Sequence, residues 1–295
     1  MTREARSVLK DLIALTKPRI IRLNVIAAFG GFWVAAKWDF SWPLMLTLLW
    51  MLVGSALTMA SACVINNYWD REMDQKMERT KDRATATGRL SPRFVLTYGI
   101  ILGIVGLAVL WFLTGPLTFW LGLLGWFVYI VVYTIWLKRT STWSTSVGGI
   151  SGAMPPVIGY CAVTNEVDAG AWILFALLFL WQPAHFWSLA IRRVEEYRAA
   201  GFPLLPVVKG IERTKKQMIP YIVLLIPLGI LFFYYGYVGY VFLTISIVAG
   251  IVWFIHTLTG FKAKNTEKWA KVNFIISVNY LMLVFLVMIG DTRWV

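Results

Sequence analysis

An amide and two carboxylates recur at intervals of four residues in the stretch NNYWDREMDQKM, at Asn66, Asp70 and Asp74. On a helix this spacing places the three side chains within about 80° of one another, along roughly 12 Å of the axis. Glu78 is expected to extend the same stripe by one turn. Oxygen ligands on one face suit Mg²⁺, which binds one or two carboxylates together with the phosphates of a substrate. The pattern therefore suits a magnesium ion whose coordination a substrate phosphate completes.

A solvated loop is the alternative explanation for this concentration of charge. Residues 66–88 hold five carboxylates and five cations, and interleaved acids and bases on a protein surface form ordinary i, i+4 pairs. Two features favour a functional site. The acids share one helix face, and Asn66 and Asp70 follow directly on an apolar run, where polar residues are costly and usually functional.

Basic residues occur at three places that could meet a diphosphate. They are Arg71, Lys76, Arg79 and Arg83 beside the stripe, Lys17, Arg19 and Arg22 in LTKPRIIRLN, and Lys138 and Arg139 in YTIWLKRTST. Each cluster alone is typical of an anchor at the end of a membrane span. Together with the acidic stripe, they indicate a phosphate site.

Membrane-spanning helices must position these residues. The mean hydropathy is +0.68 and charged residues make up 15% of the chain, against about 25% in an average soluble domain. A bilayer crossing takes about 20 apolar residues. Nine such runs are expected at residues 20–36, 42–65, 94–113, 117–137, 146–163, 169–191, 219–235, 238–258 and 272–289. Because only helices and closed barrels satisfy their backbone groups in lipid, the sequence predicts an all-α integral membrane protein, one polytopic domain over residues 1–295.

The basic residues also predict the orientation. Of the 28 Lys and Arg residues, all except Lys37 and Arg293 fall on one side of a nine-span bundle. The positive-inside rule places that side, with the N-terminus, in the cytoplasm. This topology and attraction to anionic lipid explain the net charge of +13 without a nucleic-acid partner. The first residues lack the apolar core of a cleavable signal peptide and include acids, unlike a mitochondrial transit peptide. A bacterial plasma membrane is therefore expected.

The motif N-x-x-x-D-x-x-x-D after the second of nine spans resembles the first signature of the UbiA-type intramembrane prenyltransferases. Within it, CVINNYWDREMDQKMERTKDR is similar to the haem-synthesis branch, as are LTKPR, YTIWLKRTS, GAMPPVIGY and WQPAHFWSLAIRRVEEYRAAGFPLLPVV. The resemblance covers the chain from about Leu15 to Val208. It implies a helical bundle around a central cavity open toward the cytoplasm. It also implies transfer of a farnesyl group from farnesyl diphosphate to the vinyl group of protohaem IX (haem B), giving haem O and diphosphate.

The resemblance assigns roles to individual residues. Asn66, Asp70 and Asp74 are expected to hold Mg²⁺ against the diphosphate. The expected electrostatic clamps are Arg19, Lys76, Arg79, Arg83, Lys138 and Arg139. Metal and cations together would neutralise the charge that develops on the leaving diphosphate. The aromatic face of Tyr133 is expected to stabilise the allylic cation.

The second half departs from the wider family. Many relatives carry a second D-x-x-x-D motif after span six, whereas RRVEEYRAAGFP offers the adjacent acids Glu195 and Glu196. Glu196 with Tyr197 is expected to take the second acidic position, and Glu195 is the open alternative. The comparable acidic pair of the haem branch supports that branch over quinone prenylation.

The acceptor must be held by groups near the inner half of the bundle. His185 and Trp187 in WQPAHFWSLAI are expected to contact haem, and His256 is the other histidine that could do so. Gly148 and Gly152 have the small-xxx-small spacing of a helix-packing surface. Pro155 and Pro156 are expected to break span five, and Pro183 to open span six.

Three other functions remain as alternatives. The same fold could prenylate a quinone or another aromatic or tetrapyrrole acceptor. A transporter for an anionic substrate would place its polar residues near the bilayer midplane, often in two related halves. A structural subunit of a respiratory complex would not require a one-sided acidic stripe. If the acceptor is haem, a downstream haem A synthase or terminal oxidase would receive the product.

Overall fold

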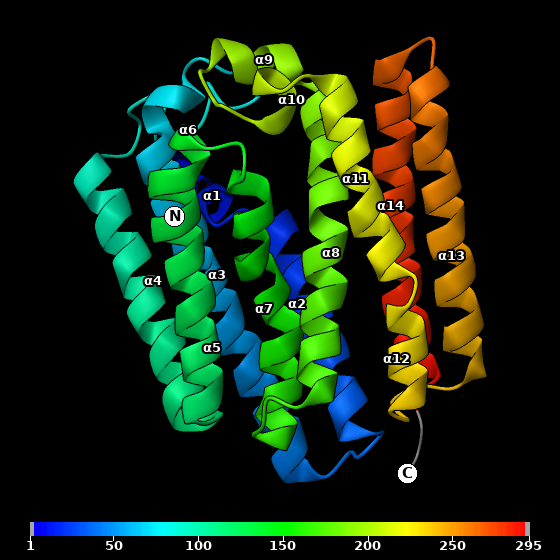
Figure 1. Cartoon of the computed structure of the whole chain (residues 1–295). Helices are drawn as coiled ribbons and strands as arrows, with labels where there is room; N and C mark the ends of the chain where they lie inside the picture. Colours follow the sequence, from blue (N-terminus) through cyan, green and yellow to red (C-terminus); the bar gives the residue numbers. More distant parts are fainter. Residues whose placement is uncertain (1–2, 293–295) are drawn as a thin grey trace.

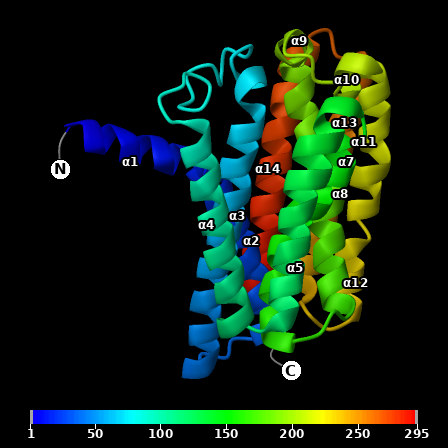
Figure 2. The ribbon, with the colours of Figure 1, turned by 90° about the vertical axis from the view of Figure 1, so that its left-hand side faces the viewer.

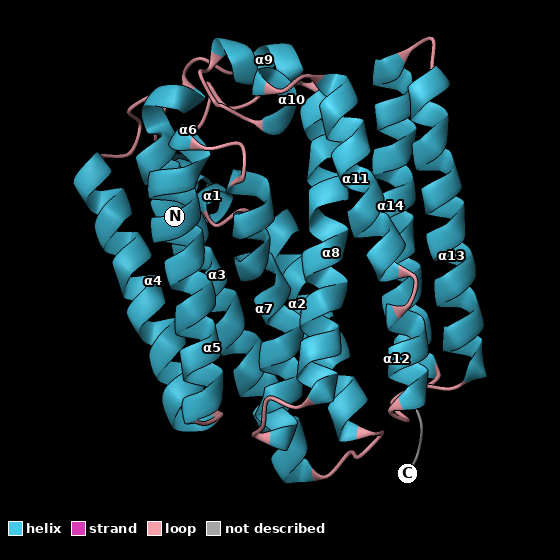
Figure 3. Ribbon diagram, viewed as in Figure 1, coloured by secondary structure: helices cyan, strands magenta, loops and turns pink. Residues whose placement is uncertain are grey.

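The chain folds into long helices that stand side by side as a bundle (Figures 1 and 3). The computed structural model describes residues 3–292. These residues form, in order, α1 (Arg3–Leu15), α2 (Pro18–Ala36), α3 (Trp42–Asp74), α4 (Pro92–Leu113), α5 (Pro116–Phe127), η1 (Val128–Leu137), α6 (Lys138–Thr140), α7 (Ser144–Thr164), α8 (Ala169–Arg192), α9 (Val194–Ala199), α10 (Leu205–Val208), α11 (Ile211–Leu225), α12 (Leu228–Tyr234), α13 (Tyr240–Thr259), η2 (Gly260–Lys262) and α14 (Thr266–Gly290). An isolated β-bridge joins Val238 and Thr292.

Within residues 3–292, nine helical segments are long and apolar enough to cross a membrane. They are α2, α3, α4, the segment from α5 through η1 to α6, α7, α8, the pair α11–α12, the segment α13–η2, and α14. The predicted all-α fold with nine spans is therefore confirmed. Arg293, one of two cations expected outside the cytoplasmic group, lies outside the described residues.

Several span boundaries differ from those expected. α3 continues without interruption to Asp74, so the acidic stripe is part of the membrane helix itself. The seventh span begins at Ile211 rather than residue 219, because the charges of its first turns conceal it from a hydropathy count. One of these cations, Lys215, is only 2% exposed, and its Nζ donates to the carbonyl of Gly260 at 2.7 Å.

The expected breaks at prolines do not occur. Pro155 and Pro156 lie inside a continuous α7, and α8 runs on through Pro183. Close packing against α2 supports α7 at this depth: a Cβ atom added at Gly31 would meet the Pro156 carbonyl. Neighbouring helices are known to stabilise prolines inside membrane spans in this way.

Prolines and capping side chains explain where several helices begin. Proline occupies one of the first two positions of α2, α3, α4 and α5, where its missing N–H has no helical partner to lose. Three helix starts, that of α4 among them, have side-chain caps. Ser91 accepts from the Phe94 amide, Asp168 from the Gly170 and Ala171 amides, and Asn265 from the Lys268 amide.

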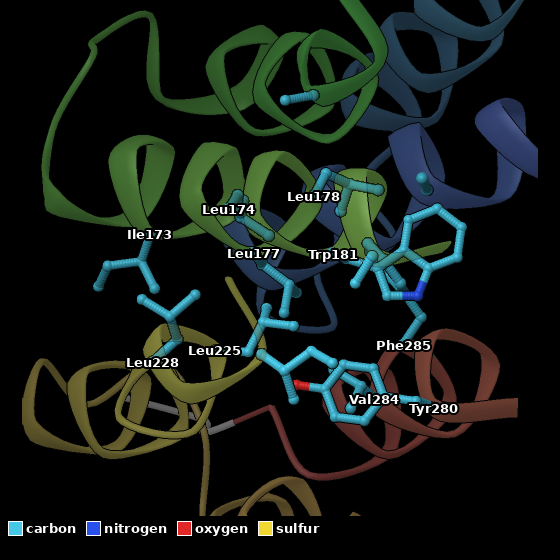
Figure 4. Packing of buried hydrophobic residues seen from close by; sticks show 14 of the residues in the cluster. Ile173, Leu174, Leu177, Leu178, Trp181, Leu225, Leu228, Tyr280, Val284 and Phe285 are labelled. Carbon is cyan, nitrogen blue, oxygen red and sulfur yellow. The ribbon is translucent and has the colours of Figure 1, made fainter. Parts of the chain in front are cut away.

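The two ends of the bundle differ in character. At the end we call the charged end, uppermost in Figure 1, lie α6, α9, α10 and the connection 75–91. The opposite end has short turns, and α2 and α7 approach closely there through Gly31 and Gly159. Toward this end a large apolar core joins α8 to α11, α12 and α14, with Leu177, Leu225 and Val284 at its centre (Figure 4).

α1 extends away from one side of the bundle, across the direction of the long helices and nearer the charged end (Figure 2). Leu9 and Ile13 on this helix are about half exposed. Asp11 accepts from Nε and Nη2 of Arg89 at 3.0 Å, which fastens α1 to the connection before α4. The Arg89 guanidinium holds the pKa of the Asp11 carboxyl below its ordinary value.

Candidate active site

The predicted stripe lies on the last turns of α3, at the charged end. Asn66, Asp70 and Asp74 are 2%, 1% and 4% exposed. The Asn66 Nδ2 donates to Oδ2 of Asp70 at 2.9 Å, so the i, i+4 spacing brings these side chains together as expected. The expectation that Glu78 extends the stripe is wrong, because α3 ends at Asp74; Glu78 is exposed and pairs with Lys81.

Two cations from the end of the fourth span hold Asp70. Lys138 Nζ pairs with its Oδ2, and Arg139 Nη2 lies 3.4 Å from its Oδ1. The Thr134 hydroxyl accepts from the Asn66 amide at 3.0 Å. Thr134 lies in η1, a π-helical segment. Such segments are rare and often occur at functional sites, and here the altered winding accompanies the approach of Thr134 and Lys138 to α3.

The connection after α3 folds back over Asp74. Arg83 Nη1 pairs with the Asp74 carboxylate at 2.7 Å. The Thr80 hydroxyl donates to the Asp74 carbonyl at 3.0 Å, which satisfies a backbone group at the end of the helix. The charged stretch is therefore not a freely solvated loop: its cation reaches into the buried site.

Lys17 is a further cation in the site, at the start of α2. Its Nζ donates to Oδ1 of Asn66 at 2.6 Å. Its backbone has φ 55° and ψ 63°, the left-handed conformation that non-glycine residues rarely adopt. Loss of water around the amine, opposed in part by nearby groups including Asp70, lowers the Lys17 pKa to about 8. A strained backbone and a dehydrated ammonium are costs that a structural anchor would not require.

The site carries more positive than negative charge. Lys17, Arg83, Lys138 and Arg139 surround the carboxylates of Asp70 and Asp74. Four cations against two carboxylates leave an excess of two positive charges in a region largely removed from water. Buried charges are retained only where they are paired, so the arrangement is suited to an anionic guest.

The donor set also fits a hard divalent metal. No group of three His, Cys, Asp or Glu side chains within residues 3–292 is arranged to hold a metal ion alone. Asp70, Asp74 and the Asn66 amide supply oxygen donors one helical turn apart. Mg²⁺ is usually bound by one or two carboxylates, with water and substrate phosphates completing its coordination. These residues therefore fit Mg²⁺ that arrives with a diphosphate.

The other predicted cations lie away from the carboxylates. Arg19 and Lys76 are exposed and form none of the ion pairs found among the described residues. Arg79 is also exposed and lies close enough to Tyr197 to lower its pKa, although burial raises that pKa overall. The structure thus brings Arg83, Lys138 and Arg139 to the carboxylates and leaves Arg19, Lys76 and Arg79 at the rim.

An apolar cap covers the charged end of the site. Met73 and Met77 from the α3 side pack against Tyr197, Ala200 and Phe202 from the segment around α9. The Lys138 ammonium lies 4.8 Å from the centre of the Phe202 ring and contributes a cation–π contact. The cap connects the two loops that carry the predicted acidic motifs and shields the ion pairs beneath it.

Glu195 and Glu196 face a different direction from the stripe. Both line an open pocket of about 410 Å³ at the ends of α8, α11 and α14, together with Arg193 and Glu267. Arg193 Nη1 lies 3.3 Å from the Glu196 carboxylate, and Arg198 pairs with Glu195. Tyr197 alone of the predicted group points into the cap over Lys138.

The predicted aromatic and imidazole groups occupy distinct places. Tyr133 lies beside the stripe, with its ring 5.8 Å from Lys138 Nζ. His185 is 8% exposed and bonds Ser277 on α14. Trp187 is fully buried and packs edge-on against Tyr221 of α11.

Some participants are not identifiable from residue type and spacing alone. Ser277 belongs to an apolar span and to none of the quoted stretches, and Thr134 lies in YTIWLKRTST without any feature that singles it out, so only the folded chain reveals their roles. Lys17 was visible in LTKPR, but nothing in that motif distinguishes it from Arg19. Pro18 fixes the start of α2 directly after Lys17, but only the folded chain shows that the Lys17 amine reaches Asn66.

Comparison with known proteins identifies close relatives in sequence. The profile of the UbiA prenyltransferase family matches residues 24–279. The chain is 47% identical to protoheme IX farnesyltransferase 1 of Bacillus subtilis over 97% of its own length and 92% of the relative's. It is 44% identical to the protoheme IX farnesyltransferase of Cronobacter sakazakii over 92% and 90% of the two chains.

Solved structures agree in fold at lower sequence identity. A digeranylgeranylglyceryl phosphate synthase superposes with a TM-score of 0.80 at 18% identity, over 96% of this chain and 98% of that one. A UbiA homologue from Archaeoglobus fulgidus bound to GPP and Mg²⁺ superposes with a TM-score of 0.64 at 17% identity, over 94% and 99%. At these identities the likeness concerns the fold.

Proposed function

The chain belongs to the UbiA prenyltransferase family, and we propose that it transfers the farnesyl group of farnesyl diphosphate to a vinyl group of protohaem IX, giving haem O. It is an enzyme of the prenyltransferase class. The acceptor follows from relatives 43–47% identical that are named protoheme IX farnesyltransferases. The observation that supports farnesyl diphosphate as the donor is the buried excess of cations around Asp70 and Asp74.

Residues of the chain would bind the diphosphate in a defined way. Asn66, Asp70 and Asp74 would hold Mg²⁺, which when bound supplies neutralisation of negative charge on the leaving group. Lys138, Arg139 and Arg83 now rest on the carboxylates. They could turn from these oxygens to those of the diphosphate, with Arg19, Lys76 and Arg79 supporting from the rim. Such preorganised charges act most strongly where water is excluded.

Bond breaking would produce an allylic cation that must survive until it reacts. The C1–O bond of the farnesyl group breaks and its electron pair leaves with the diphosphate. Tyr133 beside the stripe offers an aromatic face to the cation, and the cap around Phe202 limits entry of water. The vinyl π electrons then form the new C–C bond, and water adds to the resulting benzylic-type cation with loss of a proton.

The acceptor would lie on the side of α8. We propose His185 as its principal contact, with Trp187 and Tyr197 as the other predicted contacts and Glu196 as the acid of the second loop. α7 lies between the two substrates: Tyr133 packs near Gly148, and the Gln182 amide donates to the Gly149 carbonyl at 3.0 Å. The acceptor and donor sides are therefore connected through one helix.

We also propose that the charged end faces the cytoplasm of a bacterial cell. The distribution of Lys and Arg supports this orientation. Farnesyl diphosphate would then enter with its head in water and its tail in lipid. A haem A synthase or terminal oxidase is the expected recipient of the product.

A purified-protein assay tests the proposal. The protein in lipid nanodiscs would receive haem B, farnesyl diphosphate and Mg²⁺, and the extracted haems would be identified by mass spectrometry. Formation of haem O, abolished by a chelator and restored by Mg²⁺, is the expected outcome. Diphosphate release with a quinone precursor but not with haem would contradict the assigned acceptor.

A further inference from the structure

The imidazole of His185 contacts two aromatic rings and, at one of its two nitrogens, a serine hydroxyl. Its ring is stacked between Trp181, with centroids 4.2 Å apart, and Phe274, at 4.5 Å. Nδ1 lies 2.7 Å from the hydroxyl of Ser277. These partners come from α8 and α14 and carry no charge. Because an imidazolium among uncharged groups would be costly, the ring is neutral.

The hydrogen bonds of the Ser277 hydroxyl favour one tautomer of His185. The Ser277 hydroxyl has one proton, and its Oγ lies 2.7 Å from the carbonyl of Phe274, which can only accept. When that proton is donated to Phe274, the hydroxyl acts as an acceptor toward His185. This arrangement assigns the imidazole proton to Nδ1 and the lone pair to Nε2.

The other ring edge is left available. Nε2 of His185 has no hydrogen-bond partner within the described residues, but it is partly exposed rather than fully buried. His256 differs, because its Nε2 is fully buried and has no partner. An unprotonated imidazole nitrogen whose opposite nitrogen donates a hydrogen bond is the usual arrangement of a metal-binding histidine.

Neighbouring contacts keep Ser277 itself in place. The Trp181 indole N–H donates to the Ser277 carbonyl at 2.7 Å. One turn away, the Asn273 amide donates to Ser188 at 2.9 Å and accepts from Thr257 at 3.0 Å. These hydrogen bonds tie α14 to α8 and α13, so the backbone of Ser277 is held beside the imidazole ring.

We infer that Ser277 is a positioning residue for the acceptor: it holds His185 in the tautomer whose Nε2 can bind the iron of a tetrapyrrole substrate. The inference rests on the proposed function, because it presupposes an iron-containing acceptor. To the proposed function, the inference adds His185 Nε2 as the axial contact of the iron and Ser277 as the residue that orients it. Binding through one neutral nitrogen also suits a substrate that must leave after reaction.

The test compares haem binding by purified variants in nanodiscs. Haem B would be titrated and followed by its Soret spectrum, and farnesyl diphosphate binding with Mg²⁺ would be measured on the same samples as a check of folding. Ser277→Ala should weaken haem binding by roughly 10-fold, the usual lower bound for loss of such a partner. It should also change the Soret spectrum. Ser277→Thr, which keeps the hydroxyl, should restore both.

Two further variants make the assignment specific. His185→Gly should lose the axial spectrum and regain it when free imidazole is added, whereas His256→Gln should bind haem as the wild type does. Retention of wild-type affinity and spectrum by Ser277→Ala would overturn the positioning role. A wild-type protein that binds farnesyl diphosphate with Mg²⁺ but neither binds nor converts haem would instead overturn the proposed function, and the inference with it.

Discussion

Two buried polar clusters occupy the bundle, and they differ in almost every physical property. The cluster on α3 consists of carboxylates and cations with an excess of positive charge. The cluster between α8 and α14 contains a histidine, serines, an asparagine and a threonine, all neutral and joined by hydrogen bonds and ring stacking. One arrangement fits a metal-bound diphosphate, and the other fits a flat, largely apolar molecule.

Under the proposed function, the contrast would let one membrane domain hold two unlike substrates. Charge on α3, on α6 and on the connection after α3, together with Lys17 before α2, would keep the diphosphate at the charged end. The neutral cluster avoids the cost of burying charge where an apolar acceptor must pack. α7 separates the two, and its glycines let Tyr133 on one side and Gln182 on the other approach its backbone.

The largest expected effect comes from removing a charge of the first cluster. Asp70→Asn should lower kcat by at least about 10²–10³-fold, the loss typical of one preorganised electrostatic group. Haem binding should be unchanged, because His185 lies in the other cluster. Product formation and haem titration would be measured on the same preparation. Glu72→Gln is the matched control, since Glu72 is exposed on the same helix.

A smaller loss of activity is expected from replacing Lys17, which belongs to the same charged cluster. Lys17→Met should reduce kcat/KM for farnesyl diphosphate by about 10- to 100-fold, because hydrogen bonds to charged groups contribute about 1.5–3 kcal/mol. Lys81→Met, at an exposed ion pair, should be nearly neutral. If both lysine variants behaved like the wild type in steady-state kinetics, Lys17 would have no part in the donor site.

Substitutions at two adjacent glycines test how tightly α7, the helix between the clusters, is packed. A Cβ at position 148 would lie 2.7 Å from the Tyr133 ring, whereas one at 149 would lie no closer than 3.6 Å to Phe179. Gly148→Ala should therefore cost about 1–3 kcal/mol through overpacking. Gly149→Ala should be neutral or stabilising. Thermal denaturation in detergent distinguishes them, and equal midpoints would contradict the described packing of η1 on α7.

The smallest effect is expected at the surface. Asp11→Asn removes an ion pair with Arg89 whose arginine is nearly half exposed, so it should cost no more than about 1 kcal/mol. Because the Asp11 pKa is lowered in the folded protein, this contribution is present above the ordinary carboxyl pKa of 3.8 and is lost as the pH falls through the lowered value. Denaturation midpoints of the variant and the parent should therefore converge in acid and differ slightly near pH 7.

The sequence predicted most of the first cluster and little of the second. Apolar runs located nine spans, and the four-residue spacing of Asn66, Asp70 and Asp74 identified a shared helix face. Arg83 and Arg139 could be proposed as partners, but not distinguished from Lys76 or Arg79. That choice depends on how the connection after α3 folds back, which local propensities do not determine.

The second cluster depends on contacts between distant spans. Ser277 lies 92 positions from His185 in the chain, and a serine in an apolar helix carries no local signal. Tertiary packing also overrode the expected breaks at Pro155 and Pro156, because α2 supports α7 from the side. Residue type alone therefore identified a candidate histidine but neither its tautomer nor its partner.

If each cluster serves one substrate, a variant in one cluster should lose one ligand and keep the other. Haem B affinity and Mg²⁺-dependent farnesyl diphosphate affinity would be measured for the wild type, Asp70→Asn and His185→Gly in the same nanodiscs. Asp70→Asn is expected to lose diphosphate binding and keep haem binding, and His185→Gly is expected to do the reverse. Parallel loss of both ligands in both well-folded variants would contradict the division of the site into two clusters.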